Sequence, residues 1–232
     1  MTSSVLKSRP SGGRPTIPPL CNGDHLTRDE FERRYESMPG MNKAELIEGV
    51  VYMPSPVSAE EHGEPHFDLI TWLGVYRAGT PSVRGGDNST LRLDLENEPQ
   101  PDAYLRLLPE CGGQARLVGG YVTGAPELIV EIAASSASYD LHEKLNAYRR
   151  NGVREYVVWR VWDAVIDWFV LREARFEPLQ SRDGVYRSET FPGLWLAPDA
   201  VLRGDLAHAL KVLQQGVTSP EYAAFAARAD PR

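Results

Sequence analysis

Two acidic residues and a lysine occupy positions at which a metal-dependent hydrolysis could take place. Asp102 follows Pro101 at the start of a predicted strand, and Glu131 lies inside the apolar run Leu-Ile-Val-Glu-Ile at 128–132. Lys144 falls in the helix that we predict directly after this run. A carboxylate inside an apolar run is costly to bury without a partner. Two carboxylates on neighbouring strands, with a lysine nearby, can hold Mg²⁺ and a water, which is equipment for hydrolysing a phosphodiester.

Each of these residues also has a structural interpretation. Pro-Asp is common turn chemistry, so Asp102 alone fits a turn residue. Glu127 and Glu131 share strand parity, and both could be solvated glutamates of a half-buried strand. That alternative suits Glu127, at the rim of the strand, better than Glu131, which is deep in the run. Lys144 stands four residues after Asp140, the spacing of a surface ion pair that contributes little to stability.

Six stretches of the sequence together resemble the Uma2 family, a group of restriction endonuclease-like proteins with the PD-(D/E)xK nuclease fold. The stretches are residues 45–56, His62, Pro101-Asp102, and residues 124–131, 140–144 and 148–156. Each is weak alone, but their order and spacing over residues 25–200 are fairly specific. The resemblance implies a divalent-metal site with Mg²⁺ or Mn²⁺ and a nucleic-acid partner, DNA being the favoured one.

The resemblance also implies roles for particular residues. Asp102 and Glu131 would be the metal ligands. The usual motif places its lysine two residues after the glutamate, where this chain has Ala133, so Lys144 would be the lysine that has migrated to the helix. Glu48 would be a further acidic member of the site, with Glu45 as the alternative, and His62 would support it. Catalytic residues are therefore predicted at Asp102, Glu131, Lys144 and Glu48.

The hydrophobic pattern predicts an α/β fold. It has a central mixed β-sheet flanked by helices, with added antiparallel strands, and it is compatible with the restriction-endonuclease-like core that the resemblance implies. Helices are predicted at 29–37, 58–78, 138–150 and 204–215, and strands at 43–53 (two, with a bend at Glu48-Gly49), 91–95, 102–108, 127–133, 155–161, 165–171 and 175–179. Residues 1–23 are rich in Pro, Gly and Ser and predict a flexible leader. A domain over 24–216 and a C-terminal tail over 217–232 would follow.

Composition sets further bounds on function. The 232 residues are 42% hydrophobic and 25% charged, which is typical of one globular domain with extensions. A net charge of −7 argues against a general nucleic-acid coat protein, but a nuclease needs only a local basic patch. The two cysteines, Cys21 and Cys111, form no zinc pattern and suit a reducing compartment. Without a signal peptide or a membrane span, a cytoplasmic location is predicted.

Two readings of the function stay open at this point. One is a magnesium-dependent nuclease, and the other is a catalytically inactive member of the fold kept as a binding or assembly module. A third hypothesis, a serine hydrolase that uses Ser135 or Ser136, has little support, because the sequence contains no Gly-x-Ser-x-Gly motif. A homodimer is also predicted, because four aromatic residues crowd the region of the last long strands: Trp159, Trp162, Trp168 and Phe169.

Overall fold

A six-stranded mixed β-sheet forms the centre of the computed structural model, which describes residues 17–41, 43–53 and 58–228. The strand order is β11-β10-β9-β8-β5-β3, and β8 and β9 are the parallel pair among antiparallel neighbours. The strands are β3 (Val83–Asp87), β5 (Ala103–Leu107), β8 (Leu128–Ala133), β9 (Glu155–Arg160), β10 (Val165–Arg172) and β11 (Arg175–Pro178). The predicted mixed sheet flanked by helices is confirmed, and β8 is an interior strand as its apolar sequence requires.

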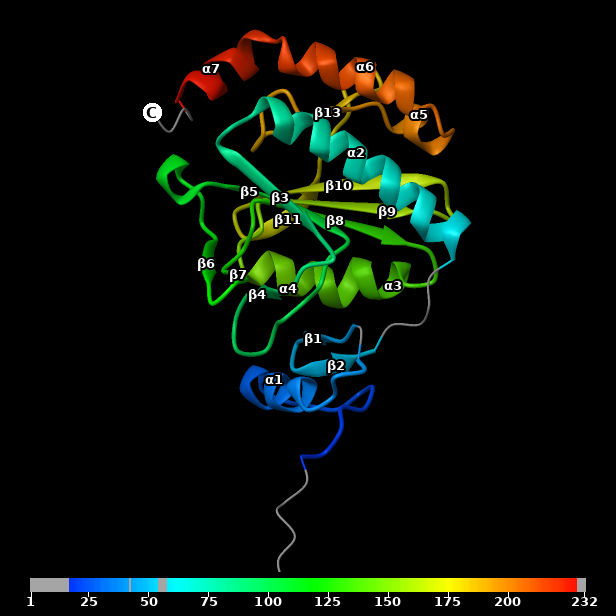
Figure 1. Cartoon of the computed structure of the whole chain (residues 1–232). Helices are drawn as coiled ribbons and strands as arrows, with labels where there is room; N and C mark the ends of the chain where they lie inside the picture. The colour runs from blue at the N-terminus through cyan, green and yellow to red at the C-terminus, as the bar shows by residue number, and fades with distance from the viewer. Residues whose placement is uncertain (1–16, 42, 54–57, 229–232) are drawn as a thin grey trace, which may run out of the picture.

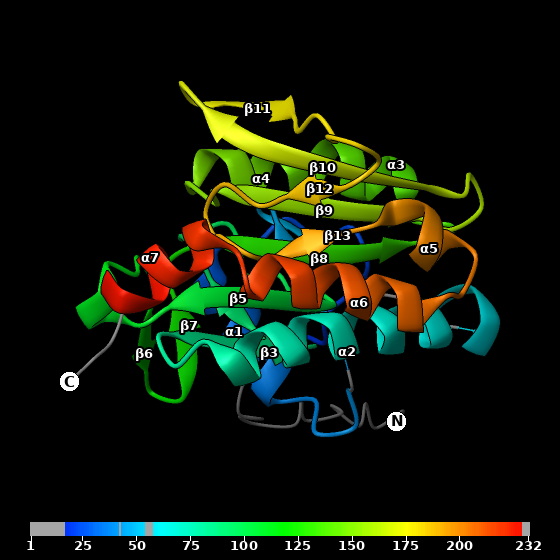
Figure 2. The ribbon, with the colours of Figure 1, turned by 90° about the horizontal axis from the view of Figure 1, so that it is seen from above.

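Helices cover both faces of this sheet (Figures 1 and 2). One face carries α2 (Glu64–Gly79), α5 (Pro198–Leu202), α6 (Leu206–Val217) and α7 (Pro220–Arg228). The other face carries one continuous helical segment made of α3 (Ala137–Tyr139), a π-helical turn η3 (Asp140–Lys144) and α4 (Leu145–Arg150). This segment follows β8 directly, so it folds back over the strand that bears Glu131. It ends at Asn151, before Gly152 with φ 80°.

Strand parity in β8 divides its side chains between the two layers. Leu128, Val130 and Ile132 enter the larger core beneath α2 and α6. Ile129 and Ala133 enter the core on the opposite face. Glu131 shares the parity of these last two and therefore points toward the helical segment that follows the strand.

An N-terminal unit packs beyond that helical segment (Figure 1). It contains α1 (Arg28–Glu36) and the hairpin of β1 (Glu45–Ile47) and β2 (Val50–Tyr52). The predicted bend is confirmed, because Glu48 and Gly49 form the turn with φ 53° and 74°. Leu20 shares a buried cluster with Phe31 and Val51. Residues 17–23 of the predicted leader therefore pack on the domain in part, while residues 1–16 lie outside the described residues.

Short elements complete the fold. The remaining ones are a π-helical turn η1 (Ala59–Gly63), a 3-10 turn η2 (Pro109–Cys111), a three-stranded sheet of β4 (Leu91–Arg92), β7 (Tyr121–Thr123) and β6 (Arg116–Val118), and a pair formed by β12 (Tyr186–Arg187) and β13 (Trp195–Leu196). Ser58 precedes η1, and its hydroxyl caps the turn by accepting a hydrogen bond from the N–H of Glu61 at 3.0 Å.

Two sequence expectations differ from the structure. The predicted strand at 91–95 stops at Arg92, because Asp94 accepts a hydrogen bond from the N–H of Glu96 at 2.8 Å and closes a turn. Part of the predicted tail is the helix α7, whose Phe225 side chain is buried in the main core.

Candidate active site

Glu131 lies at the centre of a buried polar cluster. Its Oε1 accepts a hydrogen bond from Nζ of Lys144 at 2.9 Å and another from the hydroxyl of Tyr148 at 2.7 Å. Lys144 and Tyr148 are one helical turn apart, so both face the same point on β8. The lysine predicted from the sequence therefore meets the predicted glutamate directly, although the helix and the strand are separate elements.

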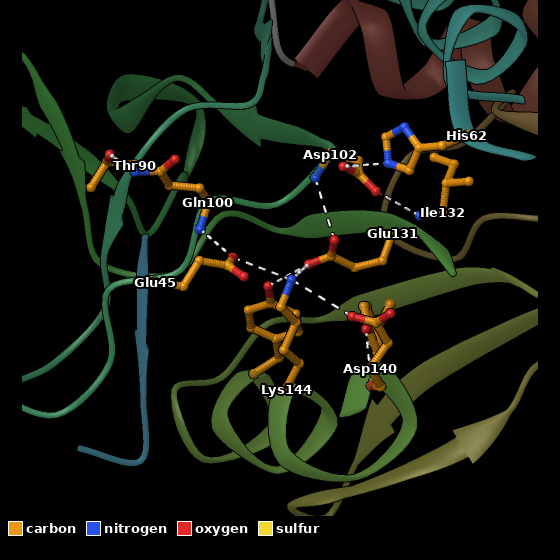
Figure 3. Close-up of polar contacts among 11 residues, drawn as sticks. Glu45, His62, Thr90, Gln100, Asp102, Glu131, Ile132, Asp140 and Lys144 are labelled. Atoms are coloured by element: carbon orange, nitrogen blue, oxygen red, sulfur yellow. Dashed lines mark hydrogen bonds and ion pairs between the residues drawn. The ribbon is translucent and has the colours of Figure 1, made fainter. Parts of the chain in front are cut away.

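Lys144 is shared among three carboxylates (Figure 3). Besides Glu131, its Nζ lies 3.2 Å from Oε1 of Glu45 and 3.6 Å from Oδ1 of Asp140. Glu45 is further fixed by the N–H of Gln100, which donates to Oε1 at 2.7 Å. The side chain of Lys144 is 5% exposed, so the contact with Asp140 is a buried interaction and not the surface ion pair that the spacing suggested.

Asp102 stands beside Glu131 at the start of β5. Its Oδ2 accepts a hydrogen bond from the N–H of Ile132 at 2.7 Å, and its Oδ1 lies 3.1 Å from Nε2 of His62. Its own backbone N–H points to Oε2 of Glu131 at 3.4 Å. His66 contacts the carbonyl oxygen of Asp102 at 3.0 Å. These contacts fix both carboxylates side by side and bring the predicted supporting histidine to Asp102.

The pKa values of the two acidic residues move in opposite directions. Burial raises the pKa of Glu131 to about 8. The positive charge of Lys144 lowers this pKa, but the nearby carboxylates raise it again in part. Burial also acts to raise the pKa of Asp102, but the hydrogen bond and charge of His62 outweigh it and the pKa is lowered. Asp102 is therefore held as a carboxylate, while Glu131 retains a proton readily when no further cation is near.

Lys144 remains an ammonium ion in this setting. Burial acts to lower its pKa, but the charges of Glu131 and Glu45 overcome that effect and raise the pKa well above its ordinary value. Burial raises the pKa of Asp140. The cluster holds more carboxylates than cations, and this excess is what a bound cation would neutralise.

The cluster forms the floor of a cavity of about 360 Å³. The π-helical turn η1 contributes Glu61 and His62 to its lining, and η3 contributes Asp140 and Lys144. Such turns are rare inside helices and occur frequently at functional sites. Asn22, Ser58 and Ser135 also line the cavity and are exposed, so it opens to solvent between them.

The donor set suits a hard cation. Among the described residues, no group of three or more His, Cys, Asp or Glu side chains is placed to hold a metal ion by itself. Mg²⁺, however, is usually bound by one or two carboxylates and keeps several waters. Asp102 and Glu131 supply two such groups, and the long contact from Asp102 is the one hydrogen bond that reaches Oε2 of Glu131 within the described chain. The residues present therefore fit Mg²⁺ or Mn²⁺.

The structure does not bring Glu48 to this cluster. Glu48 occupies the hairpin turn with a positive φ, and its Oε2 pairs with Arg150 at 2.9 Å on the outer side of α4. Glu45, three residues earlier on β1, lines the cavity instead. The alternative acidic residue from the sequence thus takes the place that was predicted for Glu48.

Two further residues make contacts that the sequence does not indicate. Tyr148 is buried against Tyr156, and its hydroxyl also donates a hydrogen bond to Glu131 at 2.7 Å. Glu127 suggested a solvated rim residue, yet it is wholly buried and accepts hydrogen bonds from the N–H groups of Leu107 at 2.8 Å and Gln114 at 2.9 Å. Glu127 directly precedes the apolar run of the buried strand, and this position indicates burial. Buried polar groups are almost always hydrogen-bonded, as Glu127 is here.

The aromatic surface behind the homodimer prediction is largely absent. Trp159 and Trp168 are in the main core, and Phe169 packs near Tyr156 and Phe176 on the other face of the sheet. Trp162 alone among the four is exposed, and its indole N–H donates to Glu61 at 3.1 Å. The argument from aromatic exposure is therefore wrong, and dimerisation itself stays a prediction.

Comparisons with known proteins agree with this architecture. The crystal structure titled as "a putative nuclease belonging to DUF820" from Anabaena variabilis is similar with a TM-score of 0.60 and 14% sequence identity. The match covers 77% of this chain and 98% of that chain, and at this identity it shows a shared fold. The model of the Uma2 family, described as "Putative restriction endonuclease", matches residues 28–199. The protein belongs to the Uma2 family.

Two further results bear on its setting. A comparison with curated proteins gives no match. Within the described part of the chain, the helices are too short or too polar to cross a membrane.

Proposed function

We propose that this protein is a metal-dependent nuclease that hydrolyses phosphodiester bonds in nucleic acid, with DNA as the expected substrate. The observation that carries the proposal is the convergence of Asp102, Glu131 and Lys144 on the floor of one cavity. Membership of the Uma2 family supports the same activity. The reaction adds water across a P–O ester bond and leaves a phosphomonoester and a free hydroxyl.

The charge of the cavity supports a requirement for a divalent cation. Its lining contains two lysines, Lys43 and Lys144, against five carboxylates: Glu45, Glu61, Asp102, Glu131 and Asp140. A phosphodiester entering this field would be repelled unless a cation offset the excess negative charge. When bound, Mg²⁺ or Mn²⁺ would polarise the phosphoryl group and acidify a bound water. We expect Asp102 and Glu131 to hold that ion.

The other residues orient these two ligands. Lys144 and Tyr148 hold Oε1 of Glu131, which leaves Oε2 on the side of Asp102. His62 and the N–H of Ile132 hold the two oxygens of Asp102. We expect Glu45 to be the third acidic residue of the site in place of Glu48, because its contact with Lys144 at 3.2 Å fixes the ammonium. Preorganised groups of this kind are more effective than groups that must be ordered during the reaction.

A cleavage assay tests the proposal. Supercoiled plasmid and single-stranded DNA are incubated with Mg²⁺ or Mn²⁺ and wild type, Asp102→Asn or the control Asp163→Asn, which alters an exposed aspartate outside the cavity. Cleavage by wild type and Asp163→Asn, with a loss of at least about a hundredfold in Asp102→Asn, is expected, since even residues that only support metal ligands are worth about 10–100-fold. Chelation should stop the reaction. Absence of cleavage by wild type under every condition would contradict the proposal and favour an inactive binding module.

A further inference from the structure

Two tyrosines form an aromatic part of the cavity lining. Tyr52 comes from β2 and Tyr139 from α3, and both line the cavity. Their ring centroids lie 4.3 Å apart with an interplanar angle of 38°. Nζ of Lys144 lies 5.4 Å from the ring of Tyr139, which places the aromatic pair next to the proposed reaction centre. Neither ring takes part in the contacts that position Asp102 and Glu131.

The polar floor of the cavity is recessed. Taken as whole residues, Asp102 and Lys144 are 4% exposed and Glu131 is 3% exposed. The residues that open to solvent are at the rim and come from three separate segments, at Asn22, at Ser58 and Glu61, and at Ser135. A cavity of about 360 Å³ is at the lower end of the size that encloses one small molecule. A flexible single strand can bend to bring one phosphate to this recessed cluster more easily than a stiff duplex can.

Two polar groups of the lining lack an ion pair or a hydrogen-bond partner among the described residues. Lys43 is partly exposed and forms no ion pair with any described residue, whereas Lys144 is shared among three carboxylates. Lys43 is thus the cation free to meet a phosphate. The hydroxyl of Tyr139 is covered and has no hydrogen-bond partner in the described chain, so the ring and not the hydroxyl is the part of Tyr139 that a ligand can use.

We infer that this site takes an unpaired nucleotide, with its base stacked on the Tyr52–Tyr139 pair and a flanking phosphate at Lys43, so that the preferred substrate class is single-stranded nucleic acid. Every base has a face that stacks on an aromatic ring, so this mode needs no base sequence but does require the base to be free of its pairing partner. The inference rests on the proposed nuclease function and specifies its substrate.

The test compares three oligonucleotides of equal length: single-stranded oligo-dT, its duplex with oligo-dA, and an abasic oligomer of tetrahydrofuran phosphate. Wild type with Mn²⁺ is expected to cut oligo-dT at least about tenfold faster than either of the others, since stacking on an aromatic side chain is worth roughly a factor of ten per base. Tyr52→Leu should lower the ratio of oligo-dT to abasic cleavage about tenfold. Tyr52→Phe, which keeps the ring, should retain it, and Tyr121→Leu, outside the cavity, serves as the control.

Binding of labelled oligo-dT and of the abasic oligomer by fluorescence anisotropy in Ca²⁺ gives a second readout that does not depend on cleavage. Here too, wild type should prefer the base-bearing strand and Tyr52→Leu should lose the preference. Equal cleavage of single strand and duplex, or an unchanged base-to-abasic ratio in Tyr52→Leu, would overturn the inference while leaving the nuclease proposal intact. If no oligonucleotide is cut, the nuclease proposal fails, and equal binding of the two strands would then overturn this inference as well.

Discussion

Glu131 and Glu155 are both buried glutamates on neighbouring parallel strands, but their surroundings differ. Glu155 accepts hydrogen bonds only from neutral groups of the described chain: the hydroxyl of Ser188, the indole of Trp168, and the N–H groups of Glu189 at 2.8 Å and Thr190 at 2.6 Å. It lies away from the cavity. Glu131 contacts an ammonium ion and a phenol, stands among further carboxylates and faces the cavity.

This comparison shows that burial alone does not mark a functional carboxylate. Burial raises the pKa of both glutamates. Glu127 is a third example, buried and bound by two backbone N–H groups. What distinguishes Glu131 is an excess of carboxylates around one lysine beside a space that a ligand can enter. Glu127 and Glu155 instead tie loops to the sheet, as satisfied buried polar groups commonly do.

The largest effect on stability is expected from Lys144→Met. The substitution would leave Glu45, Glu131 and Asp140 buried without their shared cation, and breaking a buried ion pair costs about 3–5 kcal/mol. Urea unfolding should show this loss, whereas the exposed Lys211→Met on α6 should stay within about 0.5 kcal/mol of wild type. Equal unfolding midpoints for wild type and Lys144→Met would contradict the buried cluster. Any activity measured for this variant must be expressed per folded molecule.

A paired substitution should separate the two glutamates. Glu155→Gln places an amide among donors and should cost about 1–3 kcal/mol of unfolding free energy while leaving cleavage per folded molecule unchanged. Glu131→Gln replaces a carboxyl group that burial already favours in its protonated form, so it should cost less stability. It also removes an anionic oxygen ligand of the expected metal, so it should lower cleavage on the order of a hundredfold or more. Chemical unfolding and plasmid cleavage of both variants measure this contrast. The reverse pattern, with Glu155→Gln inactive and Glu131→Gln active, would show that Glu131 is not the glutamate of the active site.

A pH-dependent effect is expected at Glu98, a buried carboxylate with a weak cationic contact, since Arg92 is 4.0 Å away. Burial and the neighbouring Glu32 raise its pKa from 4.5 to about 8. Because the folded state holds this proton more tightly, the stability it provides is complete below about pH 4.5 and is lost as the pH rises through about 8. The unfolding free energy of wild type should therefore fall relative to that of Glu98→Gln over this range. Parallel pH profiles of the two proteins would exclude the raised pKa.

Much of the sheet could be predicted from the sequence because its signals are local. The apolar run around Glu131 forms β8, and α4 ends at Arg150, where the helix predicted over 138–150 ends. Glu131 and Lys144 are brought together because the helical segment follows β8 directly and folds back over it, and Asp102 joins them because β5 pairs with β8. The first of these placements follows from the order of the elements alone.

The rest of the site depends on contacts between segments far apart in the chain. Glu45 and Glu48 have similar sequence surroundings, and only the docking of the β1–β2 hairpin against the helical segment decides that Glu45 reaches Lys144. The hydroxyl of Tyr148 likewise finds Glu131 through tertiary packing. The exposure expected for Trp159 and Trp168 was wrong for the same reason. Helices that cover both faces of the sheet bury positions that alternation alone would expose.

Titration with Mn²⁺ by calorimetry tests the central claim most directly, namely that Asp102 and Glu131 together hold a divalent cation. Wild type and Asp163→Asn should bind the ion with equal affinity, and Asp102→Asn and Glu131→Gln should each weaken binding about tenfold or more, since each loses a charged oxygen ligand. Folding of all four proteins is checked by circular dichroism before titration. Equal Mn²⁺ affinity in wild type, Asp102→Asn and Glu131→Gln, or no binding by wild type, would contradict the account.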